Sequence, residues 1–217
     1  MRKYGLRDAY GVKTPEDNLR LYARWAQTYE DDFVAANGYV LHRHVAEALA
    51  RHLANRIVPI IDVGCGTGVV GLALRALAFT TIDGIDLSPA MLDLAGRKRT
   101  EAGSPVYRSL IKADLTREAE VPHSYGGIVS AGTFTHGHLG PDSLHMLWRL
   151  AAPGCIAAIG INASHYATER FADVLATDEA DSRLEVLDIT EVDIYRNPPG
   201  DLGPGNDKAK IAVVYIH

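Results

Sequence analysis

The chain has 217 residues, 47% of them hydrophobic and 23% charged, so it can bury one full core without needing a second domain. This composition excludes a disordered or fibrous protein. The formal net charge of -5 and the single dense basic run, at residues 97–99, argue against a nucleic-acid partner.

The cysteine residues and the hydropathy of the chain indicate its cellular compartment. Cys65 and Cys155 lie in apolar or glycine-rich contexts, where a buried free thiol is the usual state. Residues 1–10 are polar and charged, and no apolar run approaches the roughly 18 residues that a membrane span requires. We therefore expect a cytoplasmic protein that has no membrane partner. Nothing in the sequence indicates an oligomeric state.

The first part of the chain has helical periodicity, over residues 18–33 and 40–54, with no strand between the two segments. We expect these helices to cover a site built by the rest of the chain. The predicted organisation is one structural domain, in which a helical cover at residues 1–55 precedes a core at residues 56–217.

Strands and helices then alternate. A β-branched strand at 57–63 precedes a helix at 69–78, and a strand at 82–87 precedes a helix that starts at Ser88 and Pro89 and runs to about residue 100. Further strands are predicted at 110–113, 127–131 and 155–161, the last following a helix at 143–151 and a Pro153-Gly154 turn. The pattern predicts an α/β fold, with helices on both faces of a mostly parallel sheet.

The end of the chain departs from this alternation. After a helix at 166–176, strands at 183–195 and 208–216 are joined by a Pro/Gly-rich loop without a helix. Two strands connected in this way are expected to pair antiparallel.

The sharpest local signal is IIDVGCGTGVVGLAL at residues 60–74. Gly64, Gly66 and Gly68 let the backbone turn tightly after the first strand and approach a ligand closely. Residues 66–71 also match the G-x-G-x-x-G pattern of dinucleotide-binding loops. The loop alone therefore leaves an NAD(P)-binding oxidoreductase as an alternative.

A carboxylate stands at the end of three successive strands, at Asp62, Asp86 and Asp114. Asp62 would attract the ammonium and sulfonium of S-adenosylmethionine, whereas it would repel the pyrophosphate of a dinucleotide. Asp86 can accept hydrogen bonds from both ribose hydroxyls, and Asp114 or the Leu115 backbone can meet an adenine amino group. A helix N-cap is an equally compatible role for Asp114. As a set, the three carboxylates favour S-adenosylmethionine as the cofactor.

These residues resemble motifs I, II and III of the class I, Rossmann-like methyltransferases, and the resemblance covers residues 18–217. It implies a seven-stranded sheet of order 3-2-1-4-5-7-6 whose last strand is antiparallel, whereas nicotinamide-binding domains end with a parallel sixth strand. Residues 24–33 and 132–144 further resemble small-molecule methyltransferases, particularly the group named after the Williams-Beuren syndrome chromosome region.

The resemblance implies methyl transfer from S-adenosylmethionine to a small-molecule acceptor, with S-adenosylhomocysteine as the product. Tyr22 and Tyr29 would lie over the methionine end of the donor, although both are equally compatible with half-buried helix residues. Residues 130–132 would line the methyl-transfer point. The other donor-binding residues implied are Asp62, Gly64, Cys65, Gly66, Gly68, Asp86, Leu87, Met91, Asp114, Leu115, Ser130 and Ala131.

Histidines after the fourth strand are the candidates for a general base. Methyl transfer needs mainly alignment and a dehydrated pocket, but a hydroxyl or protonated amine acceptor is helped by a base, for which His136 and His138 are placed. The alternative is that they only shape the loop. His42 and His44, near the cover, are less well placed. Neither pair has a cysteine or carboxylate at ligand spacing, so we expect no metal site.

A further alternative is a protein that binds the donor or its product without catalysis. The sequence predicts that Asp62→Ala abolishes donor binding and that His138→Ala spares it. Parallel calorimetry with S-adenosylmethionine, S-adenosylhomocysteine and NAD separates these hypotheses, because each predicts a different ligand preference.

Overall fold

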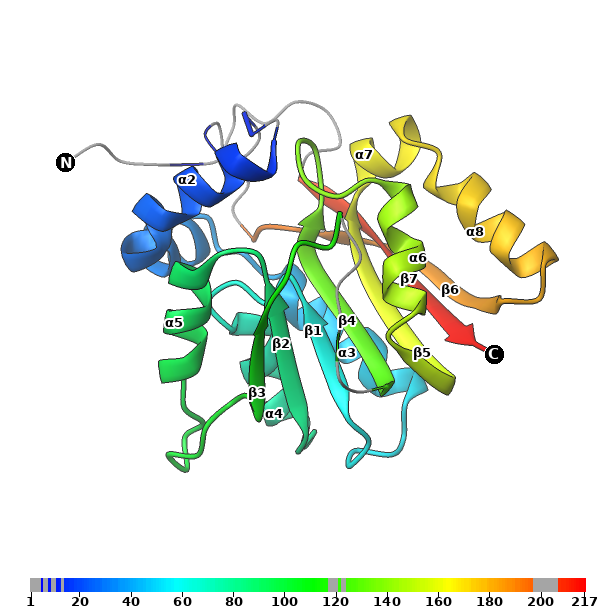
Figure 1. Ribbon diagram of the computed structural model, residues 1–217, viewed down its shortest axis with the longest axis horizontal. Coiled ribbons are helices and arrows are strands. Elements are labelled where there is room, and N and C mark those ends of the chain that lie inside the picture. Colours follow the sequence, from blue (N-terminus) through cyan, green and yellow to red (C-terminus); the bar gives the residue numbers. More distant parts are fainter. Residues whose placement is uncertain are drawn as a thin grey trace.

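The computed structural model describes residues 5, 8, 11–12, 14–116, 121, 124–196 and 207–217. Its central sheet has seven strands: β1 (Ile60–Val63), β2 (Ile82–Asp86), β3 (Ser109–Lys112), β4 (Tyr125–Phe134), β5 (Ala151–Asn162), β6 (Leu184–Asp193) and β7 (Lys208–Ile216). Their order is β3-β2-β1-β4-β5-β7-β6 (Figure 1). β1 to β5 pair in parallel, and β7 pairs antiparallel with both β5 and β6. The predicted Rossmann-like sheet is confirmed.

Helices cover both faces of the sheet. The helical elements are α2 (Pro15–Trp25), η1 (Ala26–Thr28), η2 (Glu30–Ala35), α3 (Leu41–His52), α4 (Val69–Ala76), α5 (Pro89–Arg97), η3 (Pro141–Ser143), α6 (Leu144–Trp148), α7 (Ala163–Thr168) and α8 (Phe171–Ala180). One apolar cluster packs α3, α4 and α5 against the sheet, and a second packs α6 and α8 against the opposite face. In Figure 1, α2 lies across the carboxyl ends of the parallel strands.

The first strand shows why the sequence pattern works in the centre of the sheet. Ile60, Ile61 and Val63 are all fully buried, as expected for a parallel strand covered on both faces. β1 nevertheless begins at Ile60 rather than at residue 57. Ile57 is 72% exposed, and Pro59 has no backbone N–H to donate to a neighbouring strand.

The helical segment predicted over residues 18–33 is present, but it is not one continuous α-helix. α2 begins earlier, at Pro15, where the Thr14 side chain caps it by accepting a hydrogen bond from the Asp17 N–H. It ends at Trp25, and the chain continues through a 3-10 turn (η1) and a π-helical turn (η2). This path brings the Trp25 and Tyr29 ring centroids within 5.1 Å, and those of Tyr29 and Phe33 within 5.0 Å.

Three other boundaries differ from the prediction. The helix expected over 143–151 ends at Trp148, because Ala151 already pairs with Tyr125 as the first residue of β5. The expected Pro153-Gly154 turn therefore lies within β5. The single helix expected over 166–176 is two helices, α7 and α8, separated at Arg170, which has a left-handed φ of 61°.

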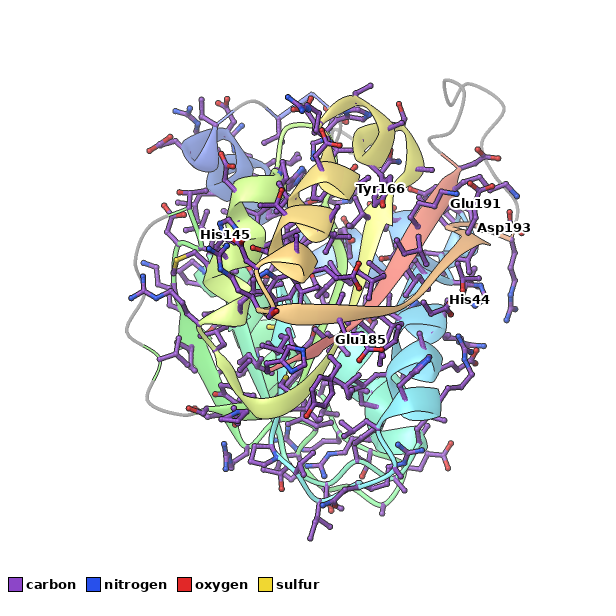
Figure 2. All side chains as sticks on the ribbon, turned by 90° about the vertical axis from the view of Figure 1, so that its right-hand side faces the viewer. His44, His145, Tyr166, Glu185, Glu191 and Asp193 are labelled. Carbon is purple, nitrogen blue, oxygen red and sulfur yellow. The ribbon has the colours of Figure 1, made fainter. Side chains whose placement is uncertain are left out.

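The β6–β7 hairpin forms the far edge of the sheet, and Figure 2 shows the carboxylates of Glu191 and Asp193 along β6. These side chains pair across the hairpin, Glu191 with Lys210 at 3.0 Å and Asp193 with Lys208. The Pro/Gly-rich connection, residues 197–206, lies outside the described residues, as do residues 1–10 except 5 and 8. No described helix has the combined length and hydropathy needed to cross a membrane.

Candidate functional site

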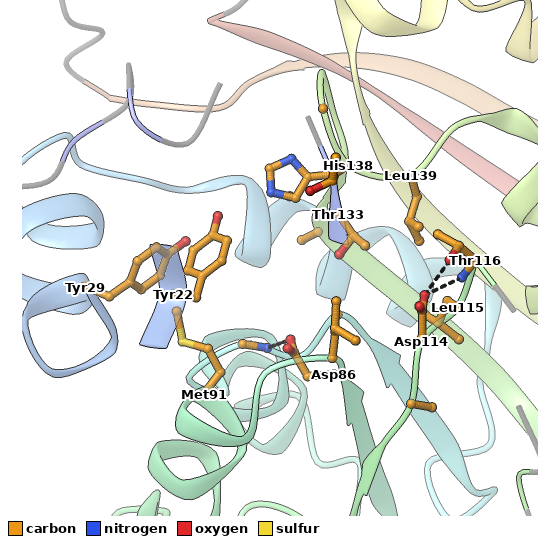
Figure 3. A pocket seen from close by; sticks show the side chains of 18 residues that line it. Tyr22, Tyr29, Asp86, Met91, Asp114, Leu115, Thr116, Thr133, His138 and Leu139 are labelled. Atoms are coloured by element: carbon orange, nitrogen blue, oxygen red, sulfur yellow. Dashed lines mark hydrogen bonds between the residues drawn. The ribbon is translucent and has the colours of Figure 1, made fainter. Parts of the chain in front are cut away.

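A cavity of about 190 Å³ opens at the carboxyl ends of β1 to β4 (Figure 3). This is the place where the strand order reverses, between β1 and β4, and where ligands bind in sheets of this kind. The described residues that line it are Thr14, Tyr22, Tyr29, Gly64, Gly66, Asp86, Leu87, Met91, Ala113, Asp114, Leu115, Thr116, Ala131, Gly132, Thr133, Gly137, His138 and Leu139. Most of the predicted donor-binding residues thus line this one cavity.

The glycine loop between β1 and α4 forms the floor of the cavity. The N–H groups of Gly64 and Cys65 donate to the Ile85 carbonyl at 2.8 and 3.0 Å, which ties the loop to β2. Gly66 has a φ of +52°, and a Cβ placed there would have no atom within 4 Å. The backbone at Gly66 therefore faces open space, and a ligand can approach it closely.

Asp86, the last residue of β2, lies beside the glycine loop. Its Oδ2 accepts from the Gly66 N–H at 2.9 Å and its Oδ1 accepts from the Ser88 N–H at 2.8 Å. Burial raises the pKa of this carboxyl, and the backbone N–H donors lower it in part. A carboxylate oxygen has more than one acceptor direction, so Asp86 can also accept from a ligand hydroxyl.

Asp114 follows β3 and closes a tight turn. Its Oδ1 accepts from the Thr116 N–H at 2.9 Å and from the Thr116 hydroxyl at 2.6 Å, and Figure 3 shows both bonds beside Leu115. Residues 117–120 lie outside the described residues, so the N-cap alternative for Asp114 stays a prediction.

Asp62 is placed differently from the expectation. It is fully buried and is not among the described residues that line the cavity. Its Oδ2 accepts a 2.7 Å hydrogen bond from the Tyr107 hydroxyl. Burial raises the pKa of Asp62 to about 7, although hydrogen bonds from Tyr107 and the Gly71 N–H act to lower it. The expected direct contact with a ligand is replaced by contacts with Tyr107 and the first turn of α4, because the carboxylate faces that helix.

Four other predicted residues also lie off the cavity wall formed by the described residues. Cys65 is buried against the sheet, and burial raises the pKa of its thiol well above the usual value. Gly68 is the N-cap of α4. The Ser130 hydroxyl donates to the Val63 carbonyl at 2.8 Å and so links β4 to β1. His136 packs edge-on against His165, with ring centroids 5.1 Å apart.

His138 does line the cavity, and its environment fixes its chemistry (Figure 3). Its Nδ1 lies 3.2 Å from the His136 carbonyl oxygen, which can only accept, so Nδ1 carries the proton. Nε2 is then a lone-pair acceptor, and it is buried without a hydrogen-bond partner among the described residues. Burial lowers the pKa of His138, which keeps the ring neutral at pH 7.

Two tyrosines close the cavity from the N-terminal cover. Tyr22 comes from α2 and Tyr29 from the turn after η1, and their ring centroids lie 5.9 Å apart in an edge-to-face arrangement. The His138 ring contacts Tyr22 at a centroid distance of 6.2 Å. Burial raises the pKa of Tyr29 well above the usual value, so its hydroxyl stays protonated.

Six lining residues were not predicted: Thr14, Ala113, Thr116, Thr133, Gly137 and Leu139. Thr14 carried a usable signal, because the run Thr14-Pro15-Glu16-Asp17 is typical of a helix start. That pattern predicts the start of a helix, but it does not predict that Thr14 lines a cavity. Gly137 and Leu139 lie in the same segment as the predicted His138, and the sequence does not show which residues of such a loop face inward.

Residues 60–154 match the family model described as "Methyltransferase domain". The solved structures with the same fold include a TehB-like SAM-dependent methyltransferase from Corynebacterium glutamicum (24% identity, TM-score 0.59, covering 94% of this chain and 100% of that one). They also include magnesium protoporphyrin IX methyltransferase from Synechocystis with bound SAM (18% identity, TM-score 0.64, covering 95% and 99%). Residues 60–154 therefore resemble a methyltransferase domain, and the described chain has the fold of these S-adenosylmethionine-dependent methyltransferases.

Among curated proteins, the methyltransferase domain is similar to human Methyltransferase-like protein 27, with 38% identity over 92 residues. That match covers 42% of this chain and 37% of the human protein. The chain spans about a third of the length of the curated relatives that it matches.

The chemistry of the cavity suits S-adenosylmethionine. Gly66 leaves space where any side chain would intrude, and Asp86 presents a carboxylate beside it for the ribose hydroxyls. Met91 and Leu115 supply apolar surface for a nucleoside base. Among the described residues, no group of three or more His, Cys, Asp or Glu side chains gathers in a way that could hold a metal ion.

Proposed function

We propose that this chain transfers a methyl group from S-adenosylmethionine to a small-molecule acceptor. The observation that carries the proposal is the cavity at the strand-order reversal, where the Gly66 backbone, Asp86, Asp114 and the two tyrosines of the cover meet. β7 inserts antiparallel between β5 and β6, which argues against the parallel sixth strand of a nicotinamide-dependent oxidoreductase.

The residues have separate roles in this proposal. Asp86 accepts from the ribose hydroxyls, the turn at Asp114 and Leu115 contacts the adenine, and Gly64 and Gly66 allow the close approach of the chain to the donor. Leu87, Met91 and Ala131 contribute the remaining walls. Tyr22 and Tyr29 cover the methionine end and exclude water from it. Asp62 acts indirectly, through the start of α4.

Bound S-adenosylmethionine supplies a methyl carbon that its sulfonium already activates. The chain then has to align an acceptor with that carbon in a dry pocket. His138 Nε2 is an unprotonated nitrogen on the cavity wall, and it takes the proton from an acceptor hydroxyl or amine. His136, which packs against His165, supports His138 through its carbonyl oxygen.

Calorimetry with S-adenosylmethionine, S-adenosylhomocysteine and NAD, each titrated separately, tests donor binding. We expect the first two to bind and NAD not to bind. Asp86→Ala removes the ribose acceptor and loosens Gly66, so we expect at least a tenfold loss of S-adenosylhomocysteine affinity. Asp93→Ala, an exposed aspartate of α5, is the matched control and should bind as the wild type does.

Turnover is tested by donor consumption in the presence of a library of small hydroxyl, thiol and amine compounds. Release of S-adenosylhomocysteine that depends on one compound supports the proposed enzyme. Tight binding of the donor without turnover by any compound would instead favour a non-catalytic binding protein, and binding of NAD alone would favour an oxidoreductase.

A further inference from the structure

A second, smaller cavity of about 50 Å³ adjoins the first. The two cavities share Tyr22, Tyr29 and Gly132 as lining residues. Because these three residues form the boundary, a molecule in the second cavity directly faces a ligand in the first. The second cavity therefore lies where an acceptor would have to bind in order to receive the methyl group.

Six of the twelve described residues that line this second cavity are aromatic. Phe33 from η2 stacks on Tyr29 at a centroid distance of 5.0 Å. It also contacts Tyr39 at 5.4 Å and Tyr195, which follows β6, at 6.0 Å. Rings arranged in this way accept a planar ring by offset or edge-to-face stacking. The shape of the walls favours an aromatic occupant.

Two buried side-chain donors on the wall, the Asn162 amide and the Thr135 hydroxyl, have no hydrogen-bond partner among the described residues. Asn162, at the end of β5, is only 3% exposed, and its Oδ1 accepts from the His165 N–H at 3.0 Å, which caps α7. This bond fixes the orientation of the amide, so the other atom is Nδ2, and it has no hydrogen-bond partner among the described residues. A buried donor left unpaired costs about 1–3 kcal/mol. An oxygen of the occupant that accepts from Nδ2 would remove this penalty.

The charge of the occupant is limited by its surroundings. No charged side chain is among the described residues that line the second cavity. An anion would be buried there without a counter-charge, and a cation would lie next to the sulfonium of the donor. The cavity holds only a few times the roughly 10–15 Å³ that one water needs, so it takes one small ring and not a fused ring system.

We propose that the second cavity is the acceptor subsite, and that it takes an uncharged phenol with one ring and a carbonyl oxygen that accepts from Asn162 Nδ2. This inference rests on the proposed function. The phenol oxygen uses a lone pair to form the bond to the methyl carbon, and the electrons of the broken carbon–sulfur bond stay on sulfur. The phenolic proton goes to His138 Nε2, which lies beside Tyr22 at the boundary.

The test compares two probes of similar size, 4-hydroxyacetophenone and 4-ethylphenol, which lacks the carbonyl oxygen. Affinities are measured by ligand-observed NMR, with and without S-adenosylhomocysteine. We expect the wild type to bind 4-hydroxyacetophenone about tenfold more tightly than 4-ethylphenol, the difference that one buried hydrogen bond supplies. It should also discriminate against the anion 4-hydroxybenzoate.

Two substitutions remove the amide Nδ2 donor of Asn162 while they keep the helix cap. Asn162→Asp and Asn162→Ser both retain an oxygen that can accept from the His165 N–H. In both variants we expect the two probes to bind equally, with unchanged S-adenosylhomocysteine affinity. The matched control is Asn55→Asp, because the Oδ1 of this exposed asparagine also accepts from a backbone N–H, that of Ile57. This control should keep the wild-type preference.

The outcomes separate the two proposals. Equal binding of the two neutral probes to the wild type, or an unchanged preference in both Asn162 variants, overturns the acceptor subsite even if S-adenosylhomocysteine binds normally. Another outcome is that the wild type prefers 4-hydroxyacetophenone in a way that depends on Asn162 and yet does not bind S-adenosylhomocysteine. That result supports a phenol-binding site in the second cavity and overturns the proposed methyl transfer.

Discussion

Asp62 shows how a single buried carboxyl sets a dependence of stability on pH. Its folded pKa of about 7 lies above the usual value, mainly because of burial. The folded state thus binds a proton that the unfolded state has released, and this contribution to stability, full at acidic pH, falls as pH rises towards 7. Asp62→Asn removes the titration, so the variant should lose less stability than the wild type between pH 5 and pH 8.

We expect that difference to be about 2–3 kcal/mol, measured by urea unfolding at the two pH values. Asp93→Asn, on the exposed face of α5, serves as the control and should follow the wild-type pH profile. Parallel pH profiles for Asp62→Asn and the wild type would contradict the assignment of a raised pKa to Asp62.

His138 has a tautomer that can be measured without knowing the acceptor. The His136 carbonyl holds the proton on Nδ1, and burial lowers the pKa of the ring. Nitrogen-15 NMR at pH 7 should therefore find Nε2 unprotonated, and the ring should gain its second proton at a lower pH than an ordinary histidine does. Once an acceptor is known, kcat should rise with pH through this pKa and then level off, because the base acts in its neutral form.

A protonated Nε2 at pH 7 would remove His138 from the role of base. The nitrogen-15 signal of His138 is assigned by its loss in the His138→Gln variant. This variant should keep S-adenosylhomocysteine affinity within about threefold of the wild type, while turnover falls by about 10² or more.

The residues that could be predicted from the sequence are those at the ends of strands. Asp86, Asp114 and Gly66 follow from the strand pattern, because consecutive parallel strands present their carboxyl ends at the same edge. Asp62 also lies near the carboxyl end of a strand, but its side chain does not line the cavity. Alternate residues of a strand point to opposite faces, and whether a strand end turns towards Tyr107 or towards the cavity depends on packing that the local pattern does not contain.

At the scale of elements, the segment before α2 contacts the loop after β4. Gly137 in that loop has a φ of +77°, and a Cβ added there would lie 1.8 Å from the Val12 carbonyl oxygen. Gly137→Ala should therefore displace the segment that carries Val12 and Thr14, and Thr14 lines the cavity. We expect S-adenosylhomocysteine affinity to fall about three- to tenfold by calorimetry.

Gly140→Ala is the control in the same loop, because a Cβ at Gly140 meets no atom within 4 Å. It should bind S-adenosylhomocysteine as the wild type does. Equal affinities for the two alanine variants would show that the Val12 contact does not shape the cavity.

Element positions were predictable where the apolar pattern repeats, and their ends were not. After Trp25 the α-helix gives way to 3-10 and π-helical turns, a change that the period of the apolar pattern does not encode. The break at Arg170 is similarly invisible, since arginine has no general preference for a left-handed backbone. Both departures come from tertiary contacts or local strain and not from helix propensity.

At the scale of the molecule, the order of the sheet came from resemblance to a family and not from the residues alone. The Pro/Gly-rich sequence between the last two strands predicts an antiparallel pair, but it does not show that β7 inserts beside β5. The division into a cover at 1–55 and a core at 56–217 stays a prediction. The structure does tie η2 to the end of α5 through an ion pair between Glu30 and Lys98.

The last prediction concerns how a ligand couples the cover to the core. Tyr22 and Tyr29 form one side of the cavity, whereas Asp86 and Asp114 at the ends of β2 and β3 form the other. A ligand that contacts both sides stabilises the docked cover, because any opening of residues 15–35 must first release the ligand. Hydrogen exchange with and without S-adenosylhomocysteine should therefore slow most in that segment.

The start of β6, near Glu185 (Figure 2), supplies the internal reference for this experiment, because β6 is an edge strand and none of its residues is among the described residues that line the first cavity. Exchange there should change little at a ligand concentration of 100 times Kd, where mass action adds about 2.7 kcal/mol against opening of the cover. Equal slowing in both segments would mean that the ligand stabilises the molecule only globally, and that the two tyrosines do not hold the cover over the donor.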